Sequence, residues 1–244
     1  MIYLGLLVGL PVAAVISQSA HHSFWSTITQ SHTVSVLEFT IGVAFASALI
    51  NAVTGVALAW VLVRDEFPGK RIVNALIDLP FALPTIVAGL VLLSLYGPGS
   101  PLGINIAGTR LAVLFALLFV TLPFVTRAVQ PVLLSLERDV EDAAACLGAR
   151  PWTIFRRIIL PAIMPATVTG ASLAFARALG EFGSVVLISG NLPRTEIASQ
   201  LIFQDVESGV PQAAAAIGVV LLAMALVVFV VIGLITRHNA RRHG

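Results

Sequence analysis

The most informative part of this chain is Asp142-Ala143-Ala144-Ala145-Cys146-Leu147-Gly148, followed after nine intervening residues by Ile158-Ile159-Leu160-Pro161. It lies in a polar segment, residues 134–161, that carries four arginines and separates strongly apolar runs. A charged segment of this length in an apolar chain faces water. Such a segment needs a partner, and the small side chains of Ala143, Ala144 and Ala145 let another backbone approach closely. We therefore expect 134–161 to be a docking segment between membrane spans.

The composition is that of an integral membrane protein. Of the 244 residues, 58% are hydrophobic and 11% charged, against about half and about a quarter in a soluble domain; the mean hydropathy is +0.99. Roughly 20 helical residues cross a bilayer, and backbone groups in lipid must be satisfied within their own segment. We therefore predict an all-α protein with six transmembrane helices, at about 2–19, 36–63, 72–96, 110–133, 162–189 and 212–236.

The basic residues predict the orientation. Only Arg110 and Arg194 fall on one side of the spans, and most of the others fall on the opposite side. Cytoplasmic loops collect Lys and Arg. We therefore expect the docking segment, the turn at 64–71 and both termini to be cytoplasmic, with the loops at 20–35, 97–109 and 190–211 facing outwards. The residues that set this direction are Arg64, Lys70, Arg71, Arg138, Arg150, Arg156, Arg157, Arg237, Arg241 and Arg242.

Local sequence predicts two short helices in the docking segment, joined at a glycine. Residues 137–147 are helix formers with an acidic start, which suits the positive end of a helix dipole. Gly148 suits the left-handed position just after a helix. Pro151 fits the first turn of a second helix, which we expect to end at Pro161. The alternative is an amphipathic hairpin that lies on the membrane surface.

Two charged residues lie inside the third and fourth spans. A charge in a span is costly, so its default interpretation is functional. Asp78 sits in the third span, where Pro80 and Pro84 loosen the helix. Arg127 lies near the cytoplasmic end of the fourth span, and we expect its side chain to snorkel towards the interface.

The fifth span carries a second charged group. Arg177 and Glu181 are four residues apart, so they lie on one helix face. They either pair with each other, or Arg177 helps to attract an anion. The stretch from Gly180 to Gly183 also suits a local break at which backbone N–H groups face an anion. The candidates for a translocation path are Asp78, Arg177, Gly180, Glu181 and Gly183.

The sequence contains no catalytic or metal-binding pattern. It has no G-x-x-x-x-G-K-[ST] phosphate loop and no G-x-S-x-G elbow, and its five His residues form no ligand spacing with acids. The single cysteine, Cys146, excludes an intrachain disulfide and a cysteine-based zinc cluster. We expect no cofactor, no metal and no nucleic-acid partner, and any ATP hydrolysis must come from another chain. The first apolar run could be a signal peptide, but no basic region precedes it.

The whole chain resembles the T-type permease subunit of bacterial sulfate/thiosulfate ABC importers. Its D-A-A-x3-G-x9-I-x-L-P spacing is similar to the loop by which importer permeases dock on their ATPase, with Asp142 where the family usually has Glu. The stretch at 77–85 supports the same family. The L-G-E-F-G stretch at 179–183 is shared with molybdate permeases, and T-E-x-A-S-x-x-I-F at 195–203 is closer to the sulfate T-type.

The resemblance implies a type I ABC importer permease. The chain would be one transmembrane domain over 1–244, with a coupling helix in its cytoplasmic loop, 134–161. The implied partners are an ATPase dimer inside, a W-type permease beside it in the lipid of the cytoplasmic (inner) membrane, and a periplasmic or lipid-anchored sulfate-binding protein. Molybdate or tungstate import and an ATP-independent anion carrier stay as alternatives. The residues implied in ATPase docking are Glu141, Asp142, Ala143, Ala144, Gly148, Ile158, Leu160 and Pro161.

Overall fold

All regular elements in the described part of this computed structural model are helices, as the all-α prediction required. The structure describes residues 3, 5–20 and 24–240. In chain order the elements are η1 (a π-helix, Gly5–Gly9), α2 (Leu10–Ala20), α3 (Phe24–Ile28), α4 (Ser31–Arg64), α5 (Lys70–Ala82), α6 (Thr85–Tyr96), α7 (Arg110–Ser135), α8 (Arg138–Cys146), α9 (Pro151–Ile154), η2 (a π-helix, Phe155–Ile159), α10 (Leu160–Leu179), α11 (Gly183–Ile188), α12 (Ala198–Glu207) and α13 (Pro211–Ala240).

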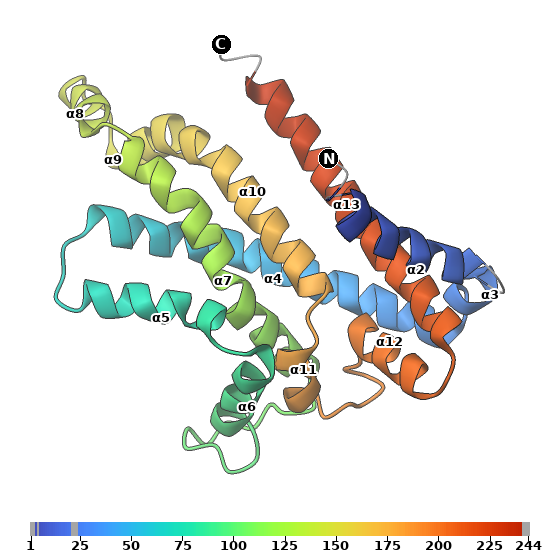
Figure 1. Cartoon of the computed structure of the whole chain (residues 1–244). Helices are drawn as coiled ribbons and strands as arrows, with labels where there is room; N and C mark the ends of the chain where they lie inside the picture. Colours follow the sequence, from blue (N-terminus) through green and yellow to red (C-terminus); the bar gives the residue numbers. More distant parts are fainter. Residues whose placement is uncertain (1–2, 4, 21–23, 241–244) are drawn as a thin grey trace.

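Three long helices, α4, α7 and α10, pack on one another at the centre of the molecule (Figure 1). Glycines permit their approach: a Cβ on Gly55 of α4 or on Gly170 of α10 would lie only 2.7 or 2.8 Å from Val125 of α7. Asn51 of α4 donates to the Leu118 carbonyl at 3.0 Å and to Thr121 Oγ1 at 2.8 Å, both on α7. Small residues and polar side chains are common at helix contacts in lipid, and here they hold the core together.

The third predicted span, 72–96, is not one helix. The axes of α5 and α6 differ by 119°, and the break falls at Leu83-Pro84. The residue before a proline is driven out of the helical region, and Leu83 accordingly has φ −81° and ψ 135°. Pro80 does not end α5, which continues to Ala82. The prediction of one unbroken helix is therefore wrong, and whether the bent pair makes one broken span or a re-entrant loop is left open.

The fifth predicted span, 162–189, is longer at its start and broken near its end. The helix begins at Pro151 and runs through α9, η2 and α10 to Leu179, so the prediction that Pro161 ends a short helix is wrong. The π turn just before Pro161 widens the helix where the proline ring would otherwise press on a carbonyl of the preceding turn. The break expected after Leu179 does occur, and α11 resumes at Gly183.

By length and composition, four described helices are able to cross a membrane: α4, α7, the continuous Pro151–Leu179 helix, and Pro211–Val231 of α13. The bent α5–α6 pair would make five. The first predicted span, 2–19, begins outside the described residues, and its described part, Gly5–Ser19, is a shorter apolar helix. This helix packs along α13. The chain is a multi-pass membrane protein, and the count of six stays a prediction.

Candidate functional site

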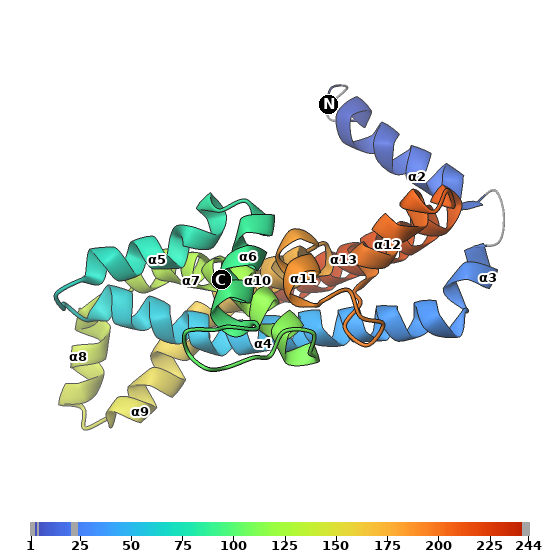
Figure 2. The ribbon, with the colours of Figure 1, turned by 90° about the horizontal axis from the view of Figure 1, so that it is seen from below.

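The docking segment forms a hairpin of α8 and α9 at one end of the molecule (Figures 1 and 2). Gly148 has a φ of +83° and donates to the Ala145 carbonyl at 2.9 Å, while Ala149 donates to the Ala144 carbonyl at 3.0 Å. These two bonds make a Schellman motif, which satisfies the open carbonyls of a helix end and needs a left-handed residue. Pro151 stands in the first turn of α9. The predicted helix, its glycine cap and the start of the second helix are confirmed.

Arg64 fastens this hairpin to the end of α4. Its guanidinium pairs with Glu141 of α8 and lies over the Trp60 ring, 5.7 Å from the centroid. Arg138 donates to the Arg64 carbonyl at 3.3 Å. Trp60 also meets Phe155 edge to face, with centroids 5.9 Å apart. The α4–α5 turn and the hairpin therefore share one end of the molecule, as the charge pattern predicted.

The tip of the hairpin exposes both polar and apolar groups. Asp142, Ala143 and Gly148 are exposed. So is Leu147, with 90% of its surface accessible, and Trp152 at the start of α9 is 68% accessible. Large apolar side chains that gather on an exposed surface indicate a contact site. Leu147 is not among the predicted docking residues, although its place between a helix end and the cap glycine was a signal that pointed to it.

The remaining residues of the docking pattern, apart from Pro161, face the molecule itself. Glu141 is engaged in its ion pair, and Ala144 and Ile158 pack against the main core. Leu160 lines an apolar groove between α4 and the α9–α10 helix, while Pro161 is exposed. The pattern thus combines an exposed tip with an inward-facing base, and the base fixes the direction in which the tip points.

A continuous helix of 29 residues, Pro151–Leu179, connects the hairpin with the interior. At 1.5 Å per residue it is about 40 Å long. Its last turn carries Arg177, and the chain breaks immediately afterwards. The helix therefore joins the hairpin to the break without an intervening loop.

At the break, Arg177 pairs with Glu181, one of the two interpretations that the sequence allowed. Arg177 Nη1 lies 2.5 Å from Glu181 Oε2, with the geometry of an ion pair and not of a directional hydrogen bond. Glu181 is 1% exposed, and its Oε1 accepts from the Ser184 N–H at 2.9 Å. Ser199 of α12 donates to the Glu181 carbonyl at 2.5 Å. The backbone N–H that directly follows the stretch from Gly180 to Gly183 is therefore bound by the chain's own carboxylate.

Asp78 forms a second ion pair, with Arg127, between α5 and α7. Arg127 Nε donates to Oδ1 at 2.7 Å and Nη2 donates to Oδ2 at 2.6 Å, the two-pronged geometry that suits guanidinium and carboxylate. Arg127 Nη2 also donates to the Asn74 carbonyl at 3.1 Å. Arg127 was expected to snorkel towards the interface, and the sequence did not predict this partner within the protein. The two side chains are still 31% and 50% exposed.

The two broken helices meet in space, since α6 packs against α11 (Figure 1). A Cβ on Gly89 would lie 2.8 Å from the Ser184 carbonyl, and one on Gly183 would lie 2.9 Å from the Ile86 nitrogen. The loop before α7 is tied to the same place, because Gly108 donates to the Ile188 carbonyl at 2.9 Å. Irregular backbone at membrane depth must be buried or line a cavity, and here each break lies next to the other helix.

The stretch that begins at Thr195 is buried and holds α12 in place. Thr195 Oγ1 donates to the Ser189 carbonyl at 2.8 Å, and Gln200 Nε2 donates to Ser189 Oγ at 2.9 Å. The Ala198 N–H donates to Thr40 Oγ1 of α4 at 2.8 Å. The T-E-x-A-S pattern therefore contributes to packing between α4, α11 and α12 in this structure.

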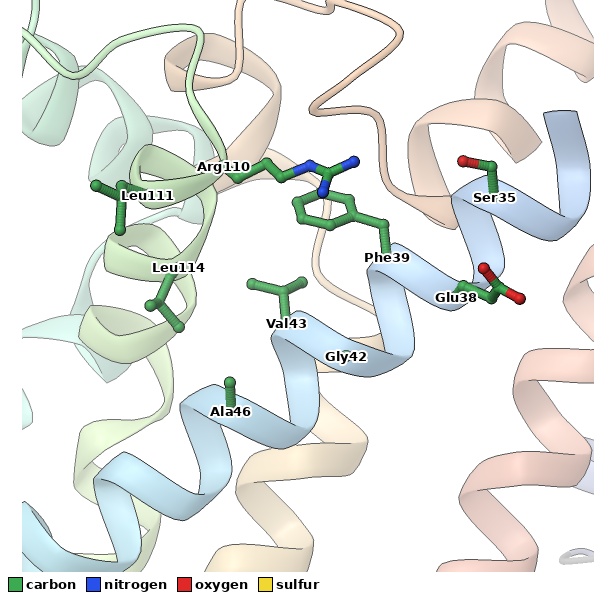
Figure 3. A pocket seen from close by; sticks show the side chains of 9 residues that line it. All are labelled: Ser35, Glu38, Phe39, Gly42, Val43, Ala46, Arg110, Leu111 and Leu114. Carbon is green, nitrogen blue, oxygen red and sulfur yellow. The ribbon is translucent and has the colours of Figure 1, made fainter.

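The end opposite the hairpin carries a pocket of about 480 Å³ between α4 and α7 (Figure 3). His32 Nε2 lies 2.9 Å from Oε2 of the buried Glu196 at this end. Burial raises the pKa of Asp205 on α12, although His32 opposes the shift. The pocket is lined by Ser35, Glu38, Phe39, Gly42, Val43, Ala46, Arg110, Leu111 and Leu114.

Charged groups elsewhere give no sign of a metal site. In the α4–α5 turn, a hydrogen bond from Lys70 and its charge lower the pKa of the exposed Glu66. Within the described residues, no group of three or more His, Cys, Asp or Glu side chains is placed to hold a metal ion.

Residues 51–242 match the model of a family described as binding-protein-dependent transport system inner membrane component. Similar relatives include the "Sulfate transport system permease protein CysT" of Synechocystis sp. and that of Synechococcus elongatus, each 45% identical to this chain. The first alignment covers 99% of this chain and 88% of the relative, and the second covers 100% and 91%.

The fold is also similar to solved transporter chains. One belongs to a bacterial ABC transporter involved in the import of the acidic polysaccharide alginate, with a TM-score of 0.79, 17% identity, and coverage of 97% of this chain and 92% of that chain. Another belongs to the inward-facing MetNI methionine ABC transporter, with a TM-score of 0.67, 21% identity, and coverage of 84% and 94%. At these identities the likeness is one of fold.

Proposed function

The chain belongs to the family of inner membrane components of binding-protein-dependent transport systems, and we propose that it is the permease subunit of an ATP-driven importer of sulfate or thiosulfate. The observation that carries this proposal is the 45% identity, over nearly the whole chain, to relatives named sulfate transport permeases. Those names favour sulfate over molybdate or tungstate as the cargo.

The α8–α9 hairpin is the part that couples this permease to a separate ATPase. Its exposed tip, with Asp142, Ala143, Leu147 and Gly148, enters a groove of the ATPase on the cytoplasmic side. The continuous helix from Pro151 to Leu179 then carries the movement of the hairpin to the break at Gly180. ATP hydrolysis belongs to the partner, and this chain is itself non-catalytic.

The translocation path runs past the broken helices. The pairs Asp78–Arg127 and Arg177–Glu181 each leave a third or so of the guanidinium side chain exposed on the single chain. Ionised groups are costly against lipid, so these surfaces face a water-filled path or the second, W-type permease. Gly180 lies at the break between Arg177 and α11, and Gly183 leaves room for α6, because a Cβ there would lie 2.9 Å from the Ile86 nitrogen.

The proposal is tested by ATP-dependent uptake of labelled sulfate. The chain is reconstituted in vesicles with its ATPase, the second permease and the sulfate-binding protein. Saturable uptake that requires an active ATPase and is weakly inhibited by molybdate is the expected result. Preferential uptake of molybdate would change the cargo, and uptake without ATP would point to a secondary carrier.

The same assay tests the interior pair. Arg177→Gln leaves the buried Glu181 without its counter-charge, so assembly or uptake should fall at least tenfold. Normal assembly together with normal uptake would remove Arg177 from the path and from any stabilising role. Arg71→Gln, at an exposed position in α5, serves as the control.

A further inference from the structure

Two arginines that are 84 residues apart are interlocked at the end opposite the hairpin. Arg110 Nε donates to the Arg194 carbonyl at 3.2 Å, and Arg194 Nε donates to the Gly108 carbonyl at 3.2 Å. Arg110 begins α7, whose other end leads into the hairpin. These are the two basic residues that the charge pattern assigns to the outer side.

The interlock uses only the Nε atoms, so it orients the guanidinium groups and leaves their Nη groups available for other hydrogen bonds. Both residues are exposed, and among the described residues neither side chain has a carboxylate partner. The ring of Phe39 covers one face of the Arg110 guanidinium, 5.1 Å from its centroid (Figure 3). The edges of the guanidinium remain open, and these edges bind a carboxylate through two parallel hydrogen bonds.

The positive charge of Arg110 is not favoured by its place in the helix. Arg110 stands in the first turn of α7, where the helix dipole disfavours a cation, and Arg194 adds a second positive charge beside it. Glu38 lines the same pocket, but Figure 3 shows its carboxylate on the far side of the Phe39 backbone from the guanidinium. Glu196, the buried acid at this end, is engaged by His32.

Below Arg110 the pocket is apolar, with Val43, Ala46 and Leu114 on its walls. Apart from Arg110, Ser35 is the one lining residue whose side chain can donate a hydrogen bond, and a dianion with so few partners is not buried against apolar surface. A carboxylate on a protein surface needs only the guanidinium edges. A solved transporter of the same fold is described in complex with a substrate-bound periplasmic protein, which supports a protein partner for this end.

We propose that Arg110 and Arg194 form a docking point for an acidic side chain of the extracytoplasmic sulfate-binding protein. This inference rests on the proposed function, which places the arginine pair outside and supplies the partner. Exposed charges at the rim of an interface mainly raise the association rate and make binding depend on salt. The pair therefore guides the loaded binding protein onto the permease.

The test uses the complete transporter in vesicles and follows ATP hydrolysis against the concentration of sulfate-loaded binding protein. In the Arg110→Gln/Arg194→Gln variant we expect the half-maximal concentration to rise about tenfold and its dependence on salt to weaken, with unchanged basal hydrolysis. Arg71→Gln is the control, because it removes one exposed positive charge from the other end. If the double variant folds poorly, Arg110→Glu serves as the second variant, because an acidic residue suits the start of a helix. With Arg110→Glu, the half-maximal concentration of the binding protein should rise further.

An unchanged half-maximal concentration and salt dependence in folded variants would overturn the docking point. So would a change confined to the apparent affinity for free sulfate at saturating binding protein, because the pair would then bind the anion itself. Both results leave the proposed function intact, provided that the unmodified transporter is stimulated by the binding protein. If the unmodified transporter shows no stimulation, the proposed function fails and the docking point fails with it.

Discussion

Gly148 is the residue on which the shape of the hairpin depends most directly. Its φ of +83° is costly for other L residues, and a Cβ there would meet no atom within 4 Å, so a substitution changes the cap and the tip without a clash. We expect the Gly148→Asp variant to insert into the membrane normally, while the amount of ATPase that co-purifies with it falls at least tenfold. The substitution adds about 1 kcal/mol of backbone strain and places a new charge at the contact surface. Gly99→Asp is the matched control.

Gly99 also has φ +83° and open space around it, but it lies in the 97–109 loop, away from the hairpin. Both variants carry the same strain and the same charge, so only the location differs. If both co-purify with the ATPase equally well, the hairpin tip is not the docking surface.

The two ion pairs differ in how far the sequence could predict them. The spacing of four residues predicted the Arg177–Glu181 pair, and the structure shows the pair, although Glu181 lies beyond Leu179, the last residue of α10. The Asp78–Arg127 pair joins residues 49 positions apart, and it depends on how α5 lies against α7. No rule of sequence spacing predicts the angle between α5 and α7. For this reason the side chain of Arg127 was expected to extend towards the interface and not to pair with Asp78.

At the scale of elements, the contact between α6 and α11 depends on glycines that have no room for a side chain. We expect Gly89→Ala to destabilise the protein by about 1–3 kcal/mol, the usual cost of overpacking, because its Cβ would lie 2.8 Å from the Ser184 carbonyl. Gly218→Ala in α13 meets nothing within 4 Å and should be neutral or slightly stabilising, since Ala favours helix. Thermal unfolding in detergent compares the two, and an equal melting temperature for both variants would contradict close packing of α6 on α11.

Prolines explain both the successes and the failures of the element predictions. Pro151 starts a helix as expected, because only its ring and φ angle matter at a first turn. Pro84 ends one helix and turns the next by 119°, whereas Pro80 and Pro161 are absorbed into helices. The local sequence identifies all of them as weak points. Whether a weak point becomes a break depends on neighbours, such as the π turn at Phe155–Ile159 and the packing of α6 on α11.

For the molecule as a whole, the hairpin and the interior break are joined by one continuous helix. The hairpin is held to α4 by Arg64, and the α9–α10 helix leads from it to Arg177 without a gap. Composition predicted a membrane protein and the loop pattern predicted a docking segment, but the direct helical link emerged only in the structure. Coupling then requires stiffness of this helix as well as contact at the tip.

That requirement can be tested at the π turn, where Arg156 and Arg157 are exposed. Replacing both by Gly weakens the helix by about 1 kcal/mol per residue relative to Ala, whereas replacing both by Ala removes the same charges and keeps the helix stiff. We expect the Gly variant to retain ATPase co-purification while its sulfate uptake per ATP hydrolysed falls severalfold, and the Ala variant to stay close to the unmodified transporter. Equal losses in both variants would assign the effect to the charges and argue against a stiff connection between the hairpin and the break.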